Sequence, residues 1–303
     1  MSNDGSGDDR LSKNQRREVA REKARVLRIE QKKKERRSKF LLQGGLVVVL
    51  LAIVTVITLF FVNTVKPAGP GPLNMLSDGI KIGRDFKAAP TAALQPNAKP
   101  VPSATNAKDV VDIQVYVDYQ CPICGTFEST NLDQIKTWVS SGAATYEVHP
   151  ISILDFQSLG KKYSTRAANA GACVANYSPN TYFDYSSELF ANQPKEGTEG
   201  LTDAQLAKLA DRAGVKNLSS VTKCIKDQTF KSWVSAASAR AATGPIPHSN
   251  VKKVANTPTV IIDGKKYVGA TDDATAFSDA VVKAVGDTFS DSTPSSPSPS
   301  ATP

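Results

Sequence analysis

The sequence predicts an α/β domain whose single sheet is interrupted by an all-helical insertion and preceded by one N-terminal transmembrane helix. Alternating apolar residues along 111–117 predict a strand. A helix pattern follows within a few residues, with Gly142 as its C-cap and an apolar face of Cys124, Phe127, Leu132, Ile135 and Val139. Residues 158–240 contain helix patterns, one of them opened by a capping box at Thr202 and Gln205, and no strand pattern. Residues 143–153 predict a second strand, a further strand runs from Thr257 to Ile262 after the helical block, and Asp263-Gly264 is a strong hairpin turn.

The positive charge of the chain is concentrated at its start. Residues 1–39 carry 14 Lys/Arg against 7 Asp/Glu, whereas the remaining residues carry 23 against 22. The folded part is therefore nearly neutral, and its sequence gives no sign of a nucleic-acid surface. For the basic leader itself, nucleic-acid binding is the alternative to a topology signal, and the apolar segment beside it favours the topology signal.

Residues 40–65 are 26 residues without a charge, rich in Val, Leu, Ile and Phe. As a helix this run is about 39 Å long at 1.5 Å per residue, enough for a hydrocarbon core of ~30 Å. A cleaved signal peptide is the alternative, but the long basic leader and the lack of a following Ala-x-Ala site favour an anchor. The positive-inside rule makes residues 1–39 a cytoplasmic tail of a single-pass cell-membrane protein.

Composition divides the part expected outside the membrane into three segments. Residues 66–108 are rich in Pro, Gly, Ala and Asn and predict an extracytoplasmic linker, in which Gly79 to Gly83 is a candidate edge strand. Residues 109–287 form the predicted domain, with its helical insertion at about 158–240. The Ser/Pro-rich residues 288–303 are predicted to be disordered.

Two cysteines lie where the first strand pattern gives way to the helix pattern. Cys121 and Cys124 are separated by Pro122 and Ile123, and Pro122 suits the first position of a helix because it has no N–H. Free amides and the helix dipole stabilise an anion at a helix N-terminus. We therefore predict that Cys121 is the nucleophile, with a lowered pKa, and that Cys124 is the resolving thiol one turn inside the helix.

Half of a zinc site is the alternative interpretation of this CxxC pair. A structural zinc site needs four ligands. The other candidates are Cys173, Cys224, His149 and His248, and none of them forms a second CxxC or an HxxxH pair. We therefore expect a redox pair and no metal or other cofactor.

The run Asp118-Tyr-Gln-Cys-Pro-Ile-Cys124 resembles the active-site run of the DsbA-like thiol–disulfide oxidoreductases of the thioredoxin superfamily. Three further stretches resemble this family in the same order: Ala167-Ala-Asn-Ala-Gly-Ala-Cys173, Leu189-Phe-Ala-Asn-Gln-Pro194 and Thr257-Pro258-Thr-Val260. The predicted order of strand, helix, strand, helical block, strand, hairpin strand and helix also looks like a thioredoxin-like sheet with a helical insertion. The resemblance covers roughly residues 110–285.

The resemblance implies an enzyme that forms disulfide bonds in reduced secreted or cell-envelope proteins. It also implies a DsbB-like or VKOR-like membrane partner that re-oxidises the dithiol. Three alternatives stay open: a disulfide isomerase, a reductase, and a tethered chaperone without catalysis.

The resemblance further implies that Pro258 is a cis-proline facing the dithiol, with the Thr257 backbone alongside as a substrate-binding edge. An ordinary trans proline opening an edge strand is the alternative. Cys173 and Cys224 are predicted to form a structural disulfide, because an oxidising compartment favours pairing. Two buried free thiols and a second redox pair are the alternatives for these cysteines.

Two positions depart from the family pattern. Ile123 stands where the family often has His or an aromatic residue, and Val115 stands where thioredoxin-like proteins often have an acid. Asp118 and Tyr119 are nearer to the cysteines in sequence, and we expect solvent exposure at a strand end for both. For His149 we expect a polar strand-end position rather than a role in tuning a thiol.

Overall fold

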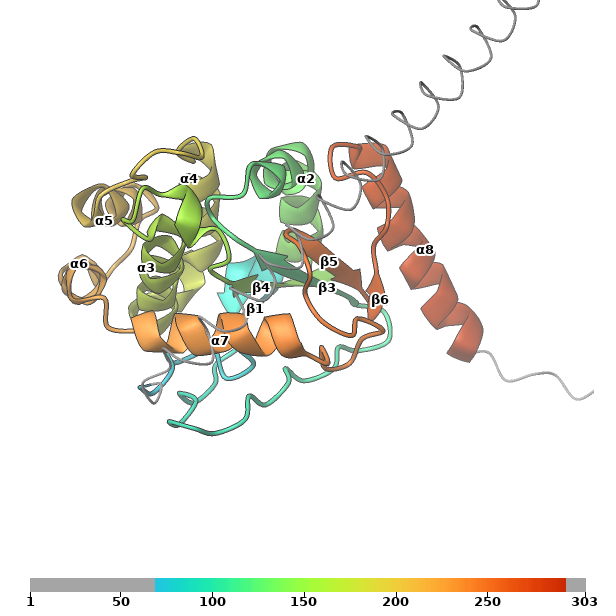
Figure 1. Ribbon diagram of the computed structural model, residues 1–303. Helices are drawn as coiled ribbons and strands as arrows, with labels where there is room; N and C mark the ends of the chain where they lie inside the picture. Colours follow the sequence, from blue (N-terminus) through green and yellow to red (C-terminus); the bar gives the residue numbers. More distant parts are fainter. Residues whose placement is uncertain (1–68, 293–303) are drawn as a thin grey trace, which may run out of the picture. The chain divides into compact units, whose positions relative to one another are not determined.

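The computed structural model describes residues 69–292 (Figure 1), all of which belong to one compact unit. The predicted cytoplasmic tail and transmembrane helix, residues 1–65, lie outside the described residues, as do residues 293–303 of the predicted Ser/Pro tail. No helix between residues 69 and 292 combines the length and apolar character that crossing a membrane requires.

The described part of the chain forms one six-stranded sheet in the order β2-β1-β4-β3-β5-β6 (Figure 1). The central pair, β3 and β4, is parallel, and the other neighbours are antiparallel. The parallel pair is joined through a helix, and the β5–β6 pair is joined by the predicted Asp-Gly turn. The strands are β1 Ile80–Gly83, β2 Lys87–Ala88, β3 Val111–Val117, β4 Ala144–Pro150, β5 Thr259–Ile262 and β6 Lys265–Lys266.

Strand β3 is buried on both faces, although its sequence alternation indicated only one apolar face. Ile113 and Val115 belong to the larger core under α2 (Pro122–Ser141) and α8 (Ala274–Ser292). Tyr116 points the other way into a smaller core with Ile261, which lies on β5. β4 and β5 pair with its two edges, and each of its faces packs into a core of its own.

Helix α2 begins and ends where the sequence predicts. Pro122 occupies its first turn, and Gly142 closes it in the left-handed conformation at φ 79°. Its buried face differs from the predicted one, because Glu128 and Asn131 are buried while Leu132 is only half-buried. The Asn131 amide is satisfied there by the carbonyls of Phe127 and Thr271, at 2.9 and 3.2 Å.

Helix α8 packs beside α2, with the rings of Phe277 and Phe127 edge to face at 5.2 Å. The Asp273 carboxylate accepts a hydrogen bond from Ala276 N at 2.9 Å, as expected for a helix cap. The helix continues past Gly286 to Ser292. The prediction of disorder from residue 288 is therefore wrong for residues 288–292, since one glycine costs a helix only about 1 kcal/mol relative to alanine.

The insertion is helical throughout, as predicted. Thr202 and Gln205 form the predicted capping box at the start of α5, where each side chain bonds the other's backbone N–H. In Figure 1, α7 runs along the sheet face opposite α2. The helices are α3 Tyr163–Tyr177, α4 Tyr182–Ala191, α5 Asp203–Arg212, α6 Leu218–Asp227 and α7 Lys231–Thr243.

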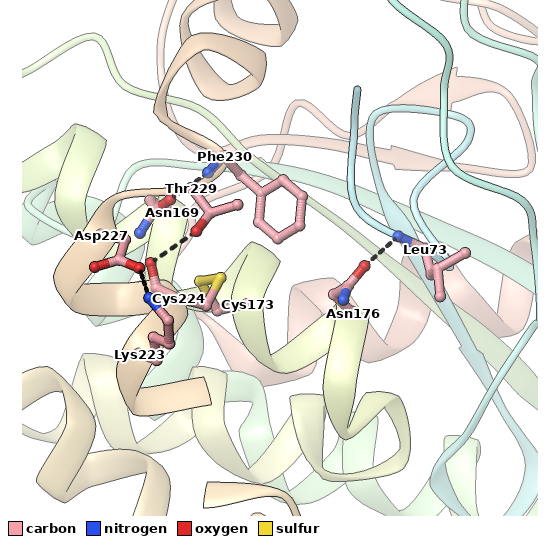
Figure 2. The surroundings of a disulfide bond; sticks show 9 residues. All are labelled: Leu73, Asn169, Cys173, Asn176, Lys223, Cys224, Asp227, Thr229 and Phe230. Atoms are coloured by element: carbon pink, nitrogen blue, oxygen red, sulfur yellow. Dashed lines mark hydrogen bonds and ion pairs between the residues drawn. A yellow bond between two sulfur atoms is a disulfide. The ribbon is translucent and has the colours of Figure 1, made fainter. Parts of the chain in front are cut away.

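A disulfide joins Cys173 on α3 to Cys224 on α6, with an S–S distance of 2.06 Å (Figure 2). Next to it, Asn169 accepts a hydrogen bond from Phe230 N at 2.8 Å, which fixes the start of α7. Closing a loop of 51 residues stabilises the fold by roughly 4 kcal/mol in the chain-entropy model. The predicted pairing is thus present and ties together helices within the insertion.

Residues 69–108 are packed onto the domain, so the predicted linker is wrong for this stretch. The candidate strand within it is β1, which pairs with β4. Met75 and Ile82 have no exposed surface, and the Asp78 carboxylate is paired with the Arg240 guanidinium at 2.6 and 2.7 Å. Composition indicated a tether because Pro, Gly and Ala dominate, whereas a few buried apolar side chains hold the segment in place.

Candidate active site

The two cysteines of the CxxC pair lie at the start of α2, directly after β3. Cys121 is the N-cap residue of the helix, and its N–H donates to the Asp118 carbonyl at 2.9 Å. Both thiols are free. Cys121 is 6% exposed and Cys124 is fully buried, while Ile123 between them is 55% exposed. Cys121 is therefore the thiol closer to solvent.

Hydrogen bonds make the two thiols unequal. The hydrogen bond from Cys124 lowers the pKa of Cys121 to about 6, assisted by the Thr257 hydroxyl and the α2 amides, although burial opposes the shift. Burial raises the pKa of Cys124 well above its usual value, and the hydrogen bond to Cys121 adds to this. At neutral pH the pair therefore consists of a Cys121 thiolate and a Cys124 thiol that donates to it.

The segment before β5 lies against the dithiol. The peptide bond between Thr257 and Pro258 is cis, as the resemblance implied. Cys121 Sγ lies 3.3 Å from the Thr257 carbonyl oxygen. The Thr257 backbone thus lies alongside the nucleophile, at the position where the resemblance implied a substrate-binding edge.

Asp118 and Tyr119 are both fully buried, so their predicted solvent exposure is wrong. The Asp118 carboxylate accepts hydrogen bonds from the N–H groups of Gln120, Ile153 and Leu154 at 2.8 to 2.9 Å. Burial raises the pKa of Asp118 to about 6, against these hydrogen bonds. The carboxylate therefore ties the turn before Cys121 to the loop after β4.

The family model described as Thioredoxin matches residues 102–281. This chain belongs to that thioredoxin family. A search of curated proteins finds 32% identity over 158 residues with the serine/threonine-protein kinase PknE of Mycobacterium tuberculosis, covering 51% of this chain and 24% of the kinase. The chain thus spans about a quarter of the length of these kinase relatives.

Among solved structures, the chain is similar to oxidised DsbA from Mycobacterium tuberculosis. The identity is 25% and the TM-score 0.53, with 71% of this chain and 100% of that chain covered. It is also similar to the reduced disulfide bond oxidoreductase DsbG from Mycobacterium tuberculosis, at 29% identity and a TM-score of 0.50, over 62% and 83% of the two chains. The structural relatives of this thioredoxin-family domain are thus thiol–disulfide oxidoreductases of the DsbA type.

Two residues near this thioredoxin-family site were not predicted from the sequence. Gln193, just after α4, donates from Nε2 to the carbonyls of Tyr119 and Cys121. Its stretch was matched to the family without a role for the side chain. Glu128 is buried one turn after Cys124, where burial raises its pKa to about 7. The available signal was a charged residue four positions after Cys124, on the apolar face of the predicted helix.

His149 lies at the end of β4, as expected, and its side chain is buried there. Its ring stacks on Tyr116 at 4.3 Å between centroids, and its Nε2 lies 3.4 Å from the Glu147 carboxylate. For the zinc alternative, residues 69–292 contain no group of three or more His, Cys, Asp or Glu side chains arranged to hold a metal ion.

Proposed function

We propose that this chain is a thiol–disulfide oxidoreductase that forms disulfide bonds in secreted or cell-envelope proteins by exchange through Cys121 and Cys124. One observation carries the proposal. At the start of α2, Cys121 has its pKa lowered to about 6 by the hydrogen bond from Cys124, which itself is buried with a raised pKa. This division of labour suits a nucleophile and a resolving thiol.

In the proposed reaction the enzyme starts with a Cys121–Cys124 disulfide. A client thiolate attacks Cys121 Sγ, the enzyme disulfide breaks, and its electron pair goes to Cys124, which takes up a proton. A second client thiolate then attacks the client sulfur of the mixed disulfide. The client disulfide forms, Cys121 leaves as a thiolate, and two electrons remain on the enzyme dithiol.

The exposed surroundings of Cys121 support a protein substrate. Ile123, Phe156 and Leu159 are 55, 67 and 66% exposed, which is unusual for large apolar side chains. Phe156 and Leu159 lie in the loop whose Gln157 carbonyl accepts a hydrogen bond from the Gln120 side chain at 3.1 Å. In the proposal, an extended client segment lies along the Thr257 backbone and contacts these apolar groups.

The proposed direction of electron flow is toward the enzyme. A stabilised thiolate stabilises the reduced dithiol, and this makes the disulfide form a better oxidant. An isomerase or a reductase on the same fold is the alternative. A reduction potential well above the value of roughly −270 mV known for thioredoxin supports the oxidase, and a potential near that value supports a reductase.

The proposal places the protein in the cell membrane as a single-pass protein with its N-terminus in the cytoplasm. The basic residues 1–39 and the uncharged residues 40–65 support this orientation. The disulfide between Cys173 and Cys224 supports an oxidising compartment for the domain. Renewed oxidation of the dithiol then falls to a DsbB-like or VKOR-like membrane partner.

The test is disulfide formation in a reduced, unfolded model substrate by the full-length oxidised protein in detergent. We expect Cys121→Ser and Cys124→Ser each to abolish turnover, because neither variant can form the Cys121–Cys124 disulfide that takes two electrons from the client. Cys173→Ala/Cys224→Ala is the control pair and should retain turnover. If Cys121→Ser oxidises the substrate as fast as the parent, the proposed function is wrong. If Cys121→Ser/Cys124→Ser keeps full biological activity, a chaperone role replaces it.

A further inference from the structure

The side chain of Gln193 forms hydrogen bonds with the turn that contains the nucleophile Cys121. Its Nε2 donates to the Tyr119 carbonyl at 3.1 Å and to the Cys121 carbonyl at 2.9 Å. The Cys121 carbonyl also accepts from Gly125 N at 3.1 Å, the first main-chain hydrogen bond of α2. One carboxamide from the helical insertion thus holds the N-cap residue of α2 and the residue two positions before it.

Gly125 makes room for this carboxamide. A Cβ atom at position 125 would lie 2.5 Å from Gln193 Oε1 and 3.2 Å from its Cδ. These atoms are the far end of a flexible side chain, so an alanine at 125 would displace the carboxamide rather than the helix backbone. Glycine inside a helix costs about 1 kcal/mol relative to alanine. The chain thus carries an unfavourable helix residue at the place where the contact needs space.

The backbone of Gln193 is itself held in place. Its N–H donates to the Phe190 carbonyl at 3.1 Å, directly after α4. Four residues later, Gly197 N donates to the Gln157 carbonyl at 2.8 Å, which also accepts from Gln120 Nε2. The loop after α4 is therefore connected to the active-site turn in two ways: directly through Gln193, and indirectly through the Gln157 carbonyl.

We propose that Gln193 is a positioning residue for Cys121: its carboxamide, seated over Gly125, fixes the first turn of α2 in the geometry that stabilises the thiolate. The N–H groups of Ile123 and Cys124 donate hydrogen bonds to that thiolate, and both belong to the first turn of α2, which Gln193 holds in place. Hydrogen bonds of this kind depend steeply on distance and angle. This inference rests on the proposed function, because it assigns a support to the same nucleophile.

The test compares Gln193→Ala and Gly125→Ala in the reduced full-length protein. The first measurement is the pH profile of Cys121 alkylation, whose midpoint reports the pKa of this thiol. We expect each variant to raise the midpoint by about one pH unit, the loss of roughly one hydrogen bond's support for the thiolate. The second is the thiol–disulfide equilibrium with glutathione. A tenfold shift toward the enzyme disulfide lowers the reduction potential by about 30 mV.

Two controls match the variants in chemistry but not in place. Gln134 also lies on α2 and donates to a carbonyl, that of Ala274 at 3.1 Å, so Gln134→Ala removes a similar bond away from the dithiol. A Cβ at Gly286 would meet nothing within 4 Å, so Gly286→Ala reports the general effect of glycine replacement in a helix. Neither control should shift the pH midpoint of alkylation, and neither should change the equilibrium constant with glutathione by more than twofold.

The double variant Gln193→Ala/Gly125→Ala is the sharpest arm. Both substitutions remove the same contact, that of the Gln193 carboxamide with the turn around Cys121. The pKa shift of the double variant should therefore equal that of either single variant rather than their sum. Full additivity, or midpoints unchanged in both single variants, overturns the proposal. If Gln193→Ala fails to fold, the alkylation midpoint of Gly125→Ala alone tests the proposal. That variant is expected to fold, because alanine is a better helix former than glycine. These thiol titrations need no client, so their outcome is distinguishable from failure of the oxidase assay.

Discussion

Cys121 Sγ lies 3.3 Å from the carbonyl oxygen of Thr257, although 136 residues separate the two along the chain. The sheet brings them together, because β3 and β5 pair with Tyr116 opposite Thr259, which places the end of one strand beside the start of the other. Thr257 serves both protonation states. Its carbonyl accepts from the Cys121 thiol, and its hydroxyl stabilises the thiolate.

Thr257→Val is predicted to raise the pKa of Cys121, because valine has the shape of threonine without the hydroxyl donor. A hydrogen bond to a charged group contributes about 1.5 kcal/mol or more, which corresponds to roughly one pKa unit. The alkylation rate of the reduced protein as a function of pH measures the shift. Thr243→Val, on the exposed end of α7, is the matched control. An unchanged profile in Thr257→Val would show that the hydroxyl does not support the thiolate.

Glu128→Gln is predicted to stabilise the protein at high pH. Burial raises the pKa of Glu128 from 4.5 to about 7, so the folded state binds more protons than the unfolded state between these values. Below pH 4.5 the carboxyl is protonated in both states and costs nothing. As the pH rises to about 7 the parent loses stability, on the order of 3 kcal/mol. Glutamine keeps an oxygen that accepts from the Tyr146 hydroxyl.

Urea unfolding of Glu128→Gln and the parent at pH 4.5 and pH 8 measures this difference in the free energy of unfolding. The variant should match the parent at the lower pH and exceed it at the higher. Glu196→Gln, at an exposed loop position, controls for the general loss of a carboxylate. A difference that stays constant with pH would contradict the burial argument.

Cys173→Ala/Cys224→Ala is predicted to lower the free energy of unfolding by up to about 4 kcal/mol, because the cross-link no longer restricts the unfolded chain. The Cys121 alkylation profile should not change, since the disulfide joins α3 and α6 and neither of its cysteines is among the groups that shift the pKa of Cys121. Urea unfolding and alkylation on the same sample give both values. A shift in the alkylation midpoint would show that the disulfide also tunes the nucleophile.

Met75→Ala tests whether residues 69–108 belong to the domain. Met75 has no exposed surface, and truncating a buried methionine costs about 2 to 5 kcal/mol. Leu73, only two residues earlier, is 45% exposed, so Leu73→Ala should cost under about 1 kcal/mol. An equal free energy of unfolding for Met75→Ala and the parent would show that residues 69–108 act as a tether rather than as part of the domain.

Local patterns in the sequence were sufficient for the elements and for the two pairs of cysteines. Pro122, Gly142, the Thr202–Gln205 capping box and the Asp263-Gly264 turn mark element ends by short-range chemistry, and each lies where expected. These signals work because caps and turns depend on residues a few positions apart. The likeness of several stretches to one family supplied the order of the strands and the cis peptide at Pro258.

Only the tertiary structure decided which residues surround the nucleophile. Asp118 and Tyr119 stand at a strand end, where sequence alone favours exposure, yet the loop after β4 and the helices of the insertion bury them. The contact of Gln193 with Cys121 spans 72 residues, and the packing of residues 69–108 depends on partners as distant as Arg240. Such contacts form only when the whole chain folds, so no periodicity or local motif in the sequence predicts them.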